Sequence, residues 1–213
     1  RKGDNVAIIG ETGSGKTSLA KLFMEFYSPD KGHIYVDGAE LQNFEVQEIR
    51  KAVVYVSQED FLFTASVREN LKMGNEEISD EEMIEISRKM GVHQFVSIME
   101  REYDSVLEER GKNLSKEQRQ KLSLTRAILR HPKILILDEA TSNMDSISER
   151  EILNYIKGIR DITLILISHR INVIADSDCI YVLQKGNIVA RGTDEQLKEQ
   201  CELYRQLYGE EEK

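Results

Sequence analysis

The sequence predicts an α/β fold in which a mixed β-sheet core with an antiparallel edge is interrupted by a helical insertion. Near-continuous runs of apolar and β-branched residues, such as "NVAIIG" and "KILILD", alternate with helical stretches. Strands of this composition are typical of sheets that helices cover on both faces. Between about Ser66 and Arg130 no convincing strand occurs, and serine-led capping boxes mark helix starts instead.

The N-terminal elements can be placed from their sequence patterns. "NVAIIG" predicts a strand, and a glycine-rich turn then leads into a helix from about Lys16 to Tyr27, which "SPDKG" ends. "HIYVDG" and "AVVYVS" predict short strands of the kind that form an antiparallel edge. In the helical block, capping boxes predict helix starts at Ser66–Glu69, Ser79–Glu82 and Ser115–Gln118.

The C-terminal part of the chain returns to strands. "KILILD", "TLILIS" and "CIYVLQ" predict buried strands separated by helices, and "LQKGNIVARG" predicts a hairpin that two short helices follow. We therefore expect one domain over 1–213, with an α/β core at 1–65 and 131–213 and a helical subdomain at 66–130. Because "RKGD" enters the first strand almost at once, we also expect N-terminal strands of this domain to precede residue 1.

The composition excludes several broad classes of function. The formal net charge of −9, from 29 basic and 38 acidic residues, argues against wholesale nucleic-acid binding, which needs a basic face. The longest apolar runs have the length of buried strands and fall well short of the ~20 residues that a membrane span requires. Cys179 and Cys201 lack metal-like spacing and suit a reducing compartment.

The segment "GETGSGKTS" predicts a phosphate-binding loop, because it matches the pattern G-x-x-x-x-G-K-[ST] between a strand and a helix. Glycines let successive N–H groups point at phosphate oxygens, and the positive end of the helix adds to that field. Lys16 can reach the β- and γ-phosphates, and the hydroxyl of Thr17 can hold Mg²⁺. The nucleotide-binding residues predicted here are Gly10, Glu11, Thr12, Gly13, Ser14, Gly15, Lys16, Thr17 and Ser18.

Polar residues at the ends of three other predicted strands are candidates for the chemistry. Asp138 and Glu139 follow four apolar residues in "ILILDEA"; the first is placed to orient Mg²⁺ and the second to take a proton from an attacking water. His169 ends "ITLILISH" at the corresponding strand end, where α/β sheets bind ligands. Gln58 closes "AVVYVSQ" in the same way.

Taken together, these motifs resemble ATP-binding cassette (ABC) ATPase domains over essentially the whole chain. "GETGSGKT", Gln58, "LSKEQRQ", "ILILDEA", "SNMD" and "SH" occur in the family's order, as Walker A, Q-loop, signature, Walker B, D-loop and switch histidine. "ERG" before the signature and "GNIVARGTDEQL" are similar to the exporter branch. The resemblance implies a P-loop NTPase fold with a RecA-like core, and ATP and Mg²⁺ as cofactors. It also implies that Glu139 and His169 are catalytic and that Gln58 contacts the nucleotide. The residues implied at the metal are Thr17, Gln58 and Asp138, and those implied in the D-loop are Ser142 and Asp145.

The resemblance also implies partners. Two such domains pack head to tail, so that each ATP lies between the Walker A of one domain and the signature of the other. The transmembrane domains of an exporter, on the same or a separate chain, would hold the ATPase at the cytoplasmic face of the cell membrane. In this family an aromatic residue that stacks on adenine lies upstream of Walker A, and here we expect it before Arg1.

The signature departs from the family pattern Leu-Ser-Gly-Gly-Gln. Leu114, Ser115 and Gln118 match, but Lys116 and Glu117 replace the two glycines. Side chains there crowd the approach of backbone N–H groups to the γ-phosphate. Glu117 would also bring a negative charge toward an anion, which at ~6 Å and an effective dielectric of ~20 costs roughly 3 kcal/mol. Lys116 would offset part of this cost if its side chain reaches the nucleotide.

Intact catalytic residues beside an altered signature resemble one half of an asymmetric heterodimeric exporter, whose partner supplies a regular signature. A homodimer that tolerates Lys-Glu and a non-hydrolysing regulatory ATP-binding module remain alternatives. A chromosome or repair ATPase is disfavoured, because no sustained heptads separate Walker A from the signature. A ribosome-associated relative is disfavoured because that type carries two cassettes and a basic surface.

Overall fold

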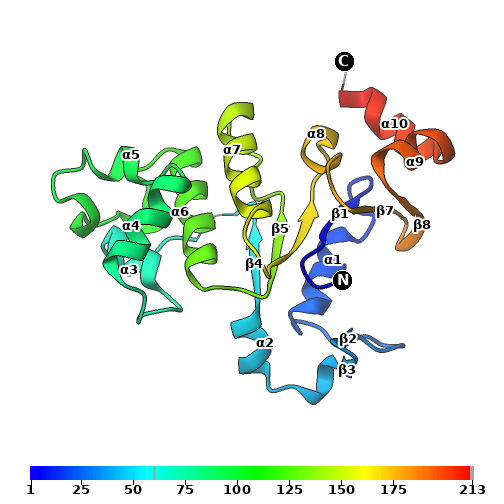
Figure 1. Ribbon diagram of the computed structural model, residues 1–213, viewed down its shortest axis with the longest axis horizontal. Helices are drawn as coiled ribbons and strands as arrows, with labels where there is room; N and C mark the ends of the chain where they lie inside the picture. The colour runs from blue at the N-terminus through cyan, green and yellow to red at the C-terminus, as the bar shows by residue number, and fades with distance from the viewer. Residues whose placement is uncertain (60, 212–213) are drawn as a thin grey trace. The chain divides into compact units, whose positions relative to one another are not determined.

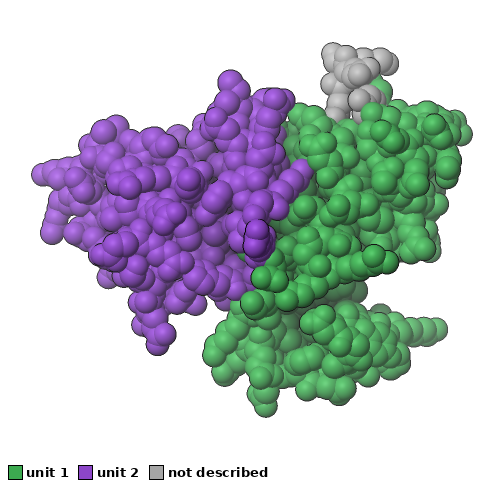
Figure 2. Space-filling view, viewed as in Figure 1, with its two compact units in different colours: residues 1–55, 133–139, 161–213 green, residues 56–132, 140–160 purple. Residues whose placement is uncertain are grey.

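The computed structural model describes residues 1–59 and 61–211; Asp60 and the last two residues of the acidic tail, Glu212 and Lys213, lie outside the described residues. The chain divides into two compact units (Figure 2). The first, here the sheet unit, comprises 1–55, 133–139 and 161–213, and the second, here the helical unit, comprises 56–132 and 140–160. The domain boundaries expected at 66 and 130 stay a prediction, while the helical unit also holds 140–160.

The main sheet has six strands in the order β4-β5-β6-β1-β7-β8 (Figure 1). Strand β1 pairs in parallel with β6 and β7, β5 pairs in parallel with β6, and β7 and β8 form an antiparallel hairpin. The sheet is therefore mixed, as the sequence predicts. The strand bounds are β1 Asn5–Ile9, β4 Val53–Ser57, β5 Ile134–Asp138, β6 Thr163–Ile167, β7 Cys179–Gln184 and β8 Asn187–Gly192.

One strand prediction is wrong in its placement. "HIYVDG" contributes β2 (Tyr35–Val36), which pairs antiparallel with β3 (Ala39–Glu40) in a separate two-stranded sheet. "AVVYVS" supplies β4, which lies beside β5 in the main sheet and takes no part in the antiparallel pair. A short 3₁₀ turn, η1 (Leu41–Asn43), and helix α2 (Val46–Ala52) connect β3 to β4.

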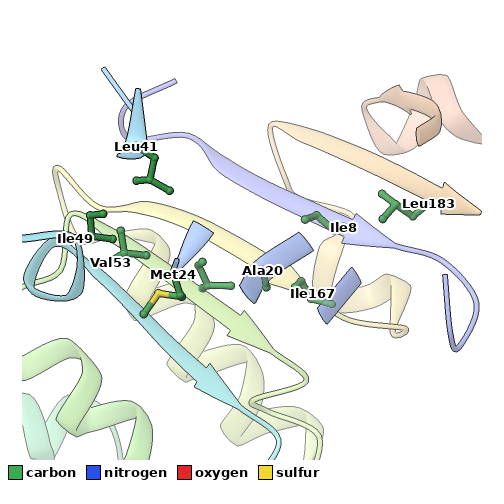
Figure 3. Packing of buried hydrophobic residues seen from close by; sticks show 9 residues of the cluster. Ile8, Ala20, Met24, Leu41, Ile49, Val53, Ile167 and Leu183 are labelled. Carbon is green, nitrogen blue, oxygen red and sulfur yellow. The ribbon is translucent and has the colours of Figure 1, made fainter. Parts of the chain in front are cut away.

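Helix α1 (Lys16–Phe23) is shorter than predicted, because it ends at Met24 and the backbone turns into the left-handed region at Glu25, with φ 52°. Ala20 and Met24, four residues apart, share one face and pack on the sheet core. Figure 3 shows them with Ile8 and Ile167 from β1 and β6. This packing fixes the start of α1 relative to the ends of the parallel strands. The remaining helices of the sheet unit are α8 Ile171–Ile174, α9 Asp194–Gln200 and α10 Glu202–Glu211.

The helical unit is built from short helices with strong N-terminal caps. Ser66 and Ser115 form complete capping boxes with Glu69 and Gln118, as predicted, whereas Ser79 caps α4 through its own hydroxyl. The elements are α3 Val67–Lys72, α4 Asp80–Lys89, α5 His93–Val96, η2 Glu102–Asp104, η3 Glu109–Gly111, α6 Lys116–Leu129 and α7 Ser146–Lys157.

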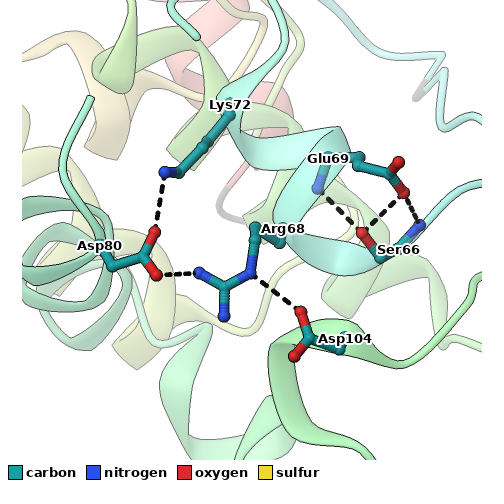
Figure 4. A network of polar contacts seen from close by, with 6 residues as sticks. All are labelled: Ser66, Arg68, Glu69, Lys72, Asp80 and Asp104. Carbon is teal, nitrogen blue, oxygen red and sulfur yellow. Dashed lines mark hydrogen bonds and ion pairs between the residues drawn. The ribbon is translucent and has the colours of Figure 1, made fainter. Parts of the chain in front are cut away.

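A polar network centred on Arg68 ties three of these helices together (Figure 4). Arg68 on α3 pairs with Asp80 at the start of α4 and with Asp104 on η2, the latter at 2.9 Å. Lys72 also pairs with Asp80, at 2.7 Å. The lysine and arginine hydrogen bonds lower the pKa of Asp80.

Within the described residues, no helix combines the length and apolar character needed to cross a bilayer.

Candidate functional site

The loop between β1 and α1 has the backbone of a phosphate-binding nest. Gly13 and Gly15 lie in the left-handed region, with φ of 81° and 104°, and Gly15 occupies the N-cap position of α1 without a side-chain cap. Only glycine adopts such conformations at little cost. At Gly10 the constraint is space, because a Cβ there would lie 2.2 Å from the carbonyl oxygen of Leu183. The loop therefore leaves backbone N–H groups at the helix start free of side-chain cover.

Lys16 folds back over this loop. Its Nζ donates to the carbonyl oxygens of Gly10 and Glu11, at 2.7 and 3.0 Å. Burial lowers the pKa of Lys16, and the charges of Glu139 and Asp138 act in the opposite direction. The charges of the two carboxylates thus favour the protonated ammonium group, which can exchange its two carbonyl partners for phosphate oxygens.

The other residues of the phosphate-binding loop differ in their exposure to solvent. Glu11, Thr12, Thr17 and Ser18 are exposed, whereas Ser14 is buried, and its hydroxyl has no hydrogen-bond partner among the described residues. A buried hydroxyl without a partner is unfavourable unless a ligand or water satisfies it. Together with the nest and Lys16, this hydroxyl fits a loop built to receive phosphate.

The paired strands β5 and β6 bring Glu139 and His169 together, as the sequence predicts for neighbouring strand ends. Asp138 is in register with Ile167, so the residues that follow each strand meet at one edge of the sheet. Oε1 of Glu139 accepts a hydrogen bond from the backbone N–H of His169 at 3.1 Å and lies 2.9 Å from its Nδ1. Glu139 has a φ of 54°, an uncommon value that places its side chain at the strand end.

Asp138 is held by a residue that the sequence patterns missed. The hydroxyl of Tyr55, on β4, donates to Oδ2 of Asp138 at 2.8 Å. Burial, with the hydrogen bond and charge of Asp138 as further causes, raises the pKa of Tyr55, so the phenol stays protonated. A tyrosine in an otherwise aliphatic run was the available signal, since a buried hydroxyl needs a partner.

These oxygen atoms fit a magnesium ion. Mg²⁺ prefers hard oxygen ligands and binds through one or two carboxylates together with substrate phosphates. The sheet unit supplies the largely buried carboxylate of Asp138, 6% exposed, and the exposed hydroxyl of Thr17 near the start of α1. Gln58, the third predicted ligand, is exposed directly after β4 and belongs to the helical unit.

In the helical unit, the segment 114–118, which the sequence predicts to be an altered signature, forms the N-terminus of α6. Ser115 Oγ accepts the N–H of Gln118 at 3.1 Å, and Gln118 Oε1 accepts the N–H of Ser115 at 2.9 Å. The Ser115 hydroxyl still has a proton to donate, because a hydroxyl is both donor and acceptor. Leu114 is buried, and Lys116 is exposed beside this helix start.

Glu117 forms an ion pair within its own helix. Its Oε1 lies 2.6 Å from Nζ of Lys121, one turn further along, and the two side chains are 33% and 14% exposed. Lys121 also donates to the hydroxyl of Ser148 on α7, at 3.2 Å. The negative charge of Glu117 is therefore paired inside the helical unit, while Lys116 is exposed at the helix start.

The D-loop residues lie beside the signature helix. The buried Gln120 of α6 accepts the backbone N–H of Asn143 at 3.1 Å. Asp145 caps α7 by accepting the N–H groups of Ile147 and Ser148 at 2.9 and 3.1 Å. The hydroxyl of Ser142 is buried and has no hydrogen-bond partner among the described residues. The signature and D-loop thus form one assembly within the helical unit.

The predicted site residues consequently fall into two groups, each assembled within its own unit. The phosphate loop, Asp138, Glu139 and His169 belong to the sheet unit. Gln58, the signature and the D-loop belong to the helical unit. Gln120 contacts Asn143 before α7 and Lys121 contacts Ser148 on α7. The sequence patterns assign neither residue a role in the site.

Comparison with known proteins identifies the family to which the chain is similar. A family model described as "ABC transporter" matches residues 1–142. The chain is 42% identical over 200 residues to the heterocyst differentiation ATP-binding protein HepA of Nostoc sp., covering 93% of this chain and 33% of HepA. It is 40% identical over 203 residues to the lactococcin-G-processing and transport ATP-binding protein LagD of Lactococcus lactis, covering 95% of this chain and 29% of LagD.

A solved structure agrees closely in fold. The structure of a bacterial Atm1-family ABC exporter with ATP bound matches with a TM-score of 0.94 and 31% sequence identity, covering 99% of this chain and 37% of the exporter chain. The chain thus spans about a third of the length of these relatives.

Proposed function

Because the chain belongs to the ABC transporter family, we propose that it is the ATP-binding and ATP-hydrolysing domain of an exporter. The observation that carries this proposal is the grouping of Lys16, Asp138, Glu139 and His169 in the sheet unit, at the edge where β5 and β6 end. A phosphate nest, a buried carboxylate and a paired general base are the parts that ATP hydrolysis needs.

Binding begins at the phosphate loop. The N–H groups at the start of α1 receive the phosphates, and Lys16 leaves the carbonyls of Gly10 and Glu11 to contact the β- and γ-phosphates. Thr17 and Asp138 would hold Mg²⁺, with Gln58 as a third ligand. A bound Mg²⁺ would neutralise charge on the phosphate oxygens.

Hydrolysis then requires a base and a charge stabiliser. Glu139 takes a proton from the attacking water as the water oxygen bonds to the γ-phosphorus, and the bond from that phosphorus to the bridging oxygen of ADP breaks. His169 Nδ1 and its backbone N–H hold Oε1 of Glu139. The other ring nitrogen of His169, when it also carries a proton, would donate a hydrogen bond to the γ-phosphate.

We further propose that the site is completed by the signature of a second ABC ATPase domain packed head to tail. Steric crowding supports an asymmetric partner, because Lys116 and Glu117 place two Cβ atoms where the family has glycines. The partner's regular signature would then complete this chain's catalytic site, and "LSKEQ" would cap a weaker site on the partner. The transmembrane domains of an exporter would receive the resulting motion and keep the domain at the cytoplasmic face of the membrane.

One observation favours a homodimer as the second candidate. Because Glu117 pairs with Lys121, its negative charge need not oppose phosphate binding at this signature. Only the steric crowding by the side chains of Lys116 and Glu117 then disfavours a homodimer. The two assemblies differ in one respect that can be measured, namely whether this chain hydrolyses ATP without another polypeptide.

The test of ATP hydrolysis compares purified protein with Glu139→Gln, which keeps size and hydrogen-bonding capacity but removes the base. We expect both proteins to bind ATP in the presence of Mg²⁺ and Glu139→Gln to turn over about 10²-fold or more slowly, the usual range for loss of a general base. Single-turnover assays with a partner domain that carries a regular signature would measure the difference. Equal rates for the two proteins would contradict the role of Glu139, and absence of ATP binding would contradict the proposed function.

A further inference from the structure

We propose that Tyr55 is a positioning residue for the magnesium site, which orients the carboxylate of Asp138 toward the nucleotide. This inference rests on the proposed function, since it concerns the residue assigned to Mg²⁺. It adds a residue from β4 to a site otherwise described by the phosphate loop and the ends of β5 and β6.

The geometry is specific. The hydroxyl of Tyr55 lies 2.8 Å from Oδ2 of Asp138 across 83 residues of sequence, and the carboxylate is only 6% exposed. The Tyr55 ring packs against the core cluster that contains Ile8, Ala20 and Ile136 (Figure 3 shows the first two). A ring held by that packing cannot follow the carboxylate, so the hydrogen bond fixes the carboxylate to the core.

The consequence for a cation follows from how a carboxylate uses its two oxygens. A neutral phenol that donates to Oδ2 leaves the full negative charge on Asp138 and restrains rotation of the carboxylate, so that Oδ1 keeps one direction. Hydrogen-bond partners of metal-binding carboxylates commonly act in this way, and their loss weakens metal binding about 10- to 100-fold.

Tyr55→Phe tests the inference, because it removes the hydroxyl and keeps the packed ring. Tyr181→Phe is the matched control, since Tyr181 also packs against the core cluster and no hydrogen bond to Asp138 is recorded for it among the described residues. Binding of a fluorescent ATP analogue is titrated with Mg²⁺ and, separately, measured in EDTA. We expect Tyr55→Phe to raise the Mg²⁺ midpoint about tenfold, with unchanged analogue affinity in EDTA and an unchanged midpoint for Tyr181→Phe.

The other outcomes would contradict either the inference or the proposed function. A Mg²⁺ midpoint for Tyr55→Phe equal to that of the unmodified protein overturns the inference, and a lower melting temperature alone would show that the hydroxyl serves stability only. If the unmodified protein binds the analogue but Mg²⁺ has no effect, the inference is also overturned. Failure to bind the analogue in either condition contradicts the proposed function itself. A steady-state assay adds a second readout, in which the KM for Mg²⁺ rises more than kcat falls.

Discussion

The ion pair between Glu117 and Lys121 leads to the first prediction, because it determines whether Glu117 would repel a phosphate at the proposed signature. The perturbation is a double-mutant cycle of Glu117→Gln and Lys121→Met, each of which removes one charge with little change in size. The N–O distance of 2.6 Å and the low exposure of Lys121, at 14%, indicate a well-ordered pair.

The expected coupling free energy between Glu117 and Lys121 follows from these contacts. Pairs one helical turn apart contribute about 0.2–0.5 kcal/mol at the surface, and exposed pairs reach at most about 1 kcal/mol, so we expect a coupling of about 0.5–1 kcal/mol for this half-buried pair. Lys121→Met also removes the 3.2 Å hydrogen bond to Ser148. That bond is worth about 1 kcal/mol, so the single variant should lose about 1.5–2 kcal/mol of unfolding free energy.

The assay is urea denaturation of the four proteins at low salt and at 1 M salt, with the cycle evaluated as coupling free energy. Glu109 and Lys112 provide a control pair, because they lie 3.3 Å apart and are 73% and 66% exposed, so their coupling should be smaller and vanish in salt. A coupling for Glu117 and Lys121 within about 0.2 kcal/mol of zero, below the range for helical pairs, would refute the reasoning. Glu117 would then be free to face the nucleotide.

Three other predictions concern the framework of the site. Gly10→Ala should destabilise the protein by about 1–3 kcal/mol in urea denaturation, because its Cβ meets the Leu183 carbonyl oxygen at 2.2 Å, and unchanged stability would contradict the close packing. Asp80→Asn should lower the urea midpoint at pH 7, and by progressively less as the pH falls below about 3.9: the folded-state pKa of Asp80 is lowered, so its contribution is fully present above that unfolded value and is lost as pH falls through the folded value. A pH-independent loss would show that Asp80 acts through packing. Asp145→Ala should lower the melting temperature whereas Asp145→Asn should not, since both carboxylate and amide can cap α7; equal losses would exclude capping as the cause.

Much of the site could be predicted because its parts are local in sequence. The phosphate loop is a short motif between a strand and a helix, and Glu139 and His169 each follow a strongly apolar strand. Parallel pairing of such strands brings their carboxyl ends to one edge, so the contact between Glu139 and His169 follows from the pattern.

The misplaced elements show where local patterns lose information. The apolar run of β4 indicates a strand but not which strand it pairs with, so the pattern alone wrongly favours the antiparallel edge over the position beside β5. The segment after Phe23 still favours helix by composition, and only the left-handed turn at Glu25 ends it. Tyr55 in an aliphatic run indicates a buried hydroxyl that needs a partner, but the partner cannot be identified from the run, because Asp138 lies 83 residues away and the contact depends on the strand order.

Whether this chain needs a partner's signature is decided by its steady-state ATPase rate as a function of protein concentration, compared with that of the double variant Lys116→Gly/Glu117→Gly. If this chain relies on a partner's signature, the unmodified chain hydrolyses ATP slowly, and the double variant is faster with a rate that rises more than linearly with concentration. Equal and substantial rates for the two proteins would contradict that claim and show that the chain works as a homodimer with its own Lys-Glu signature.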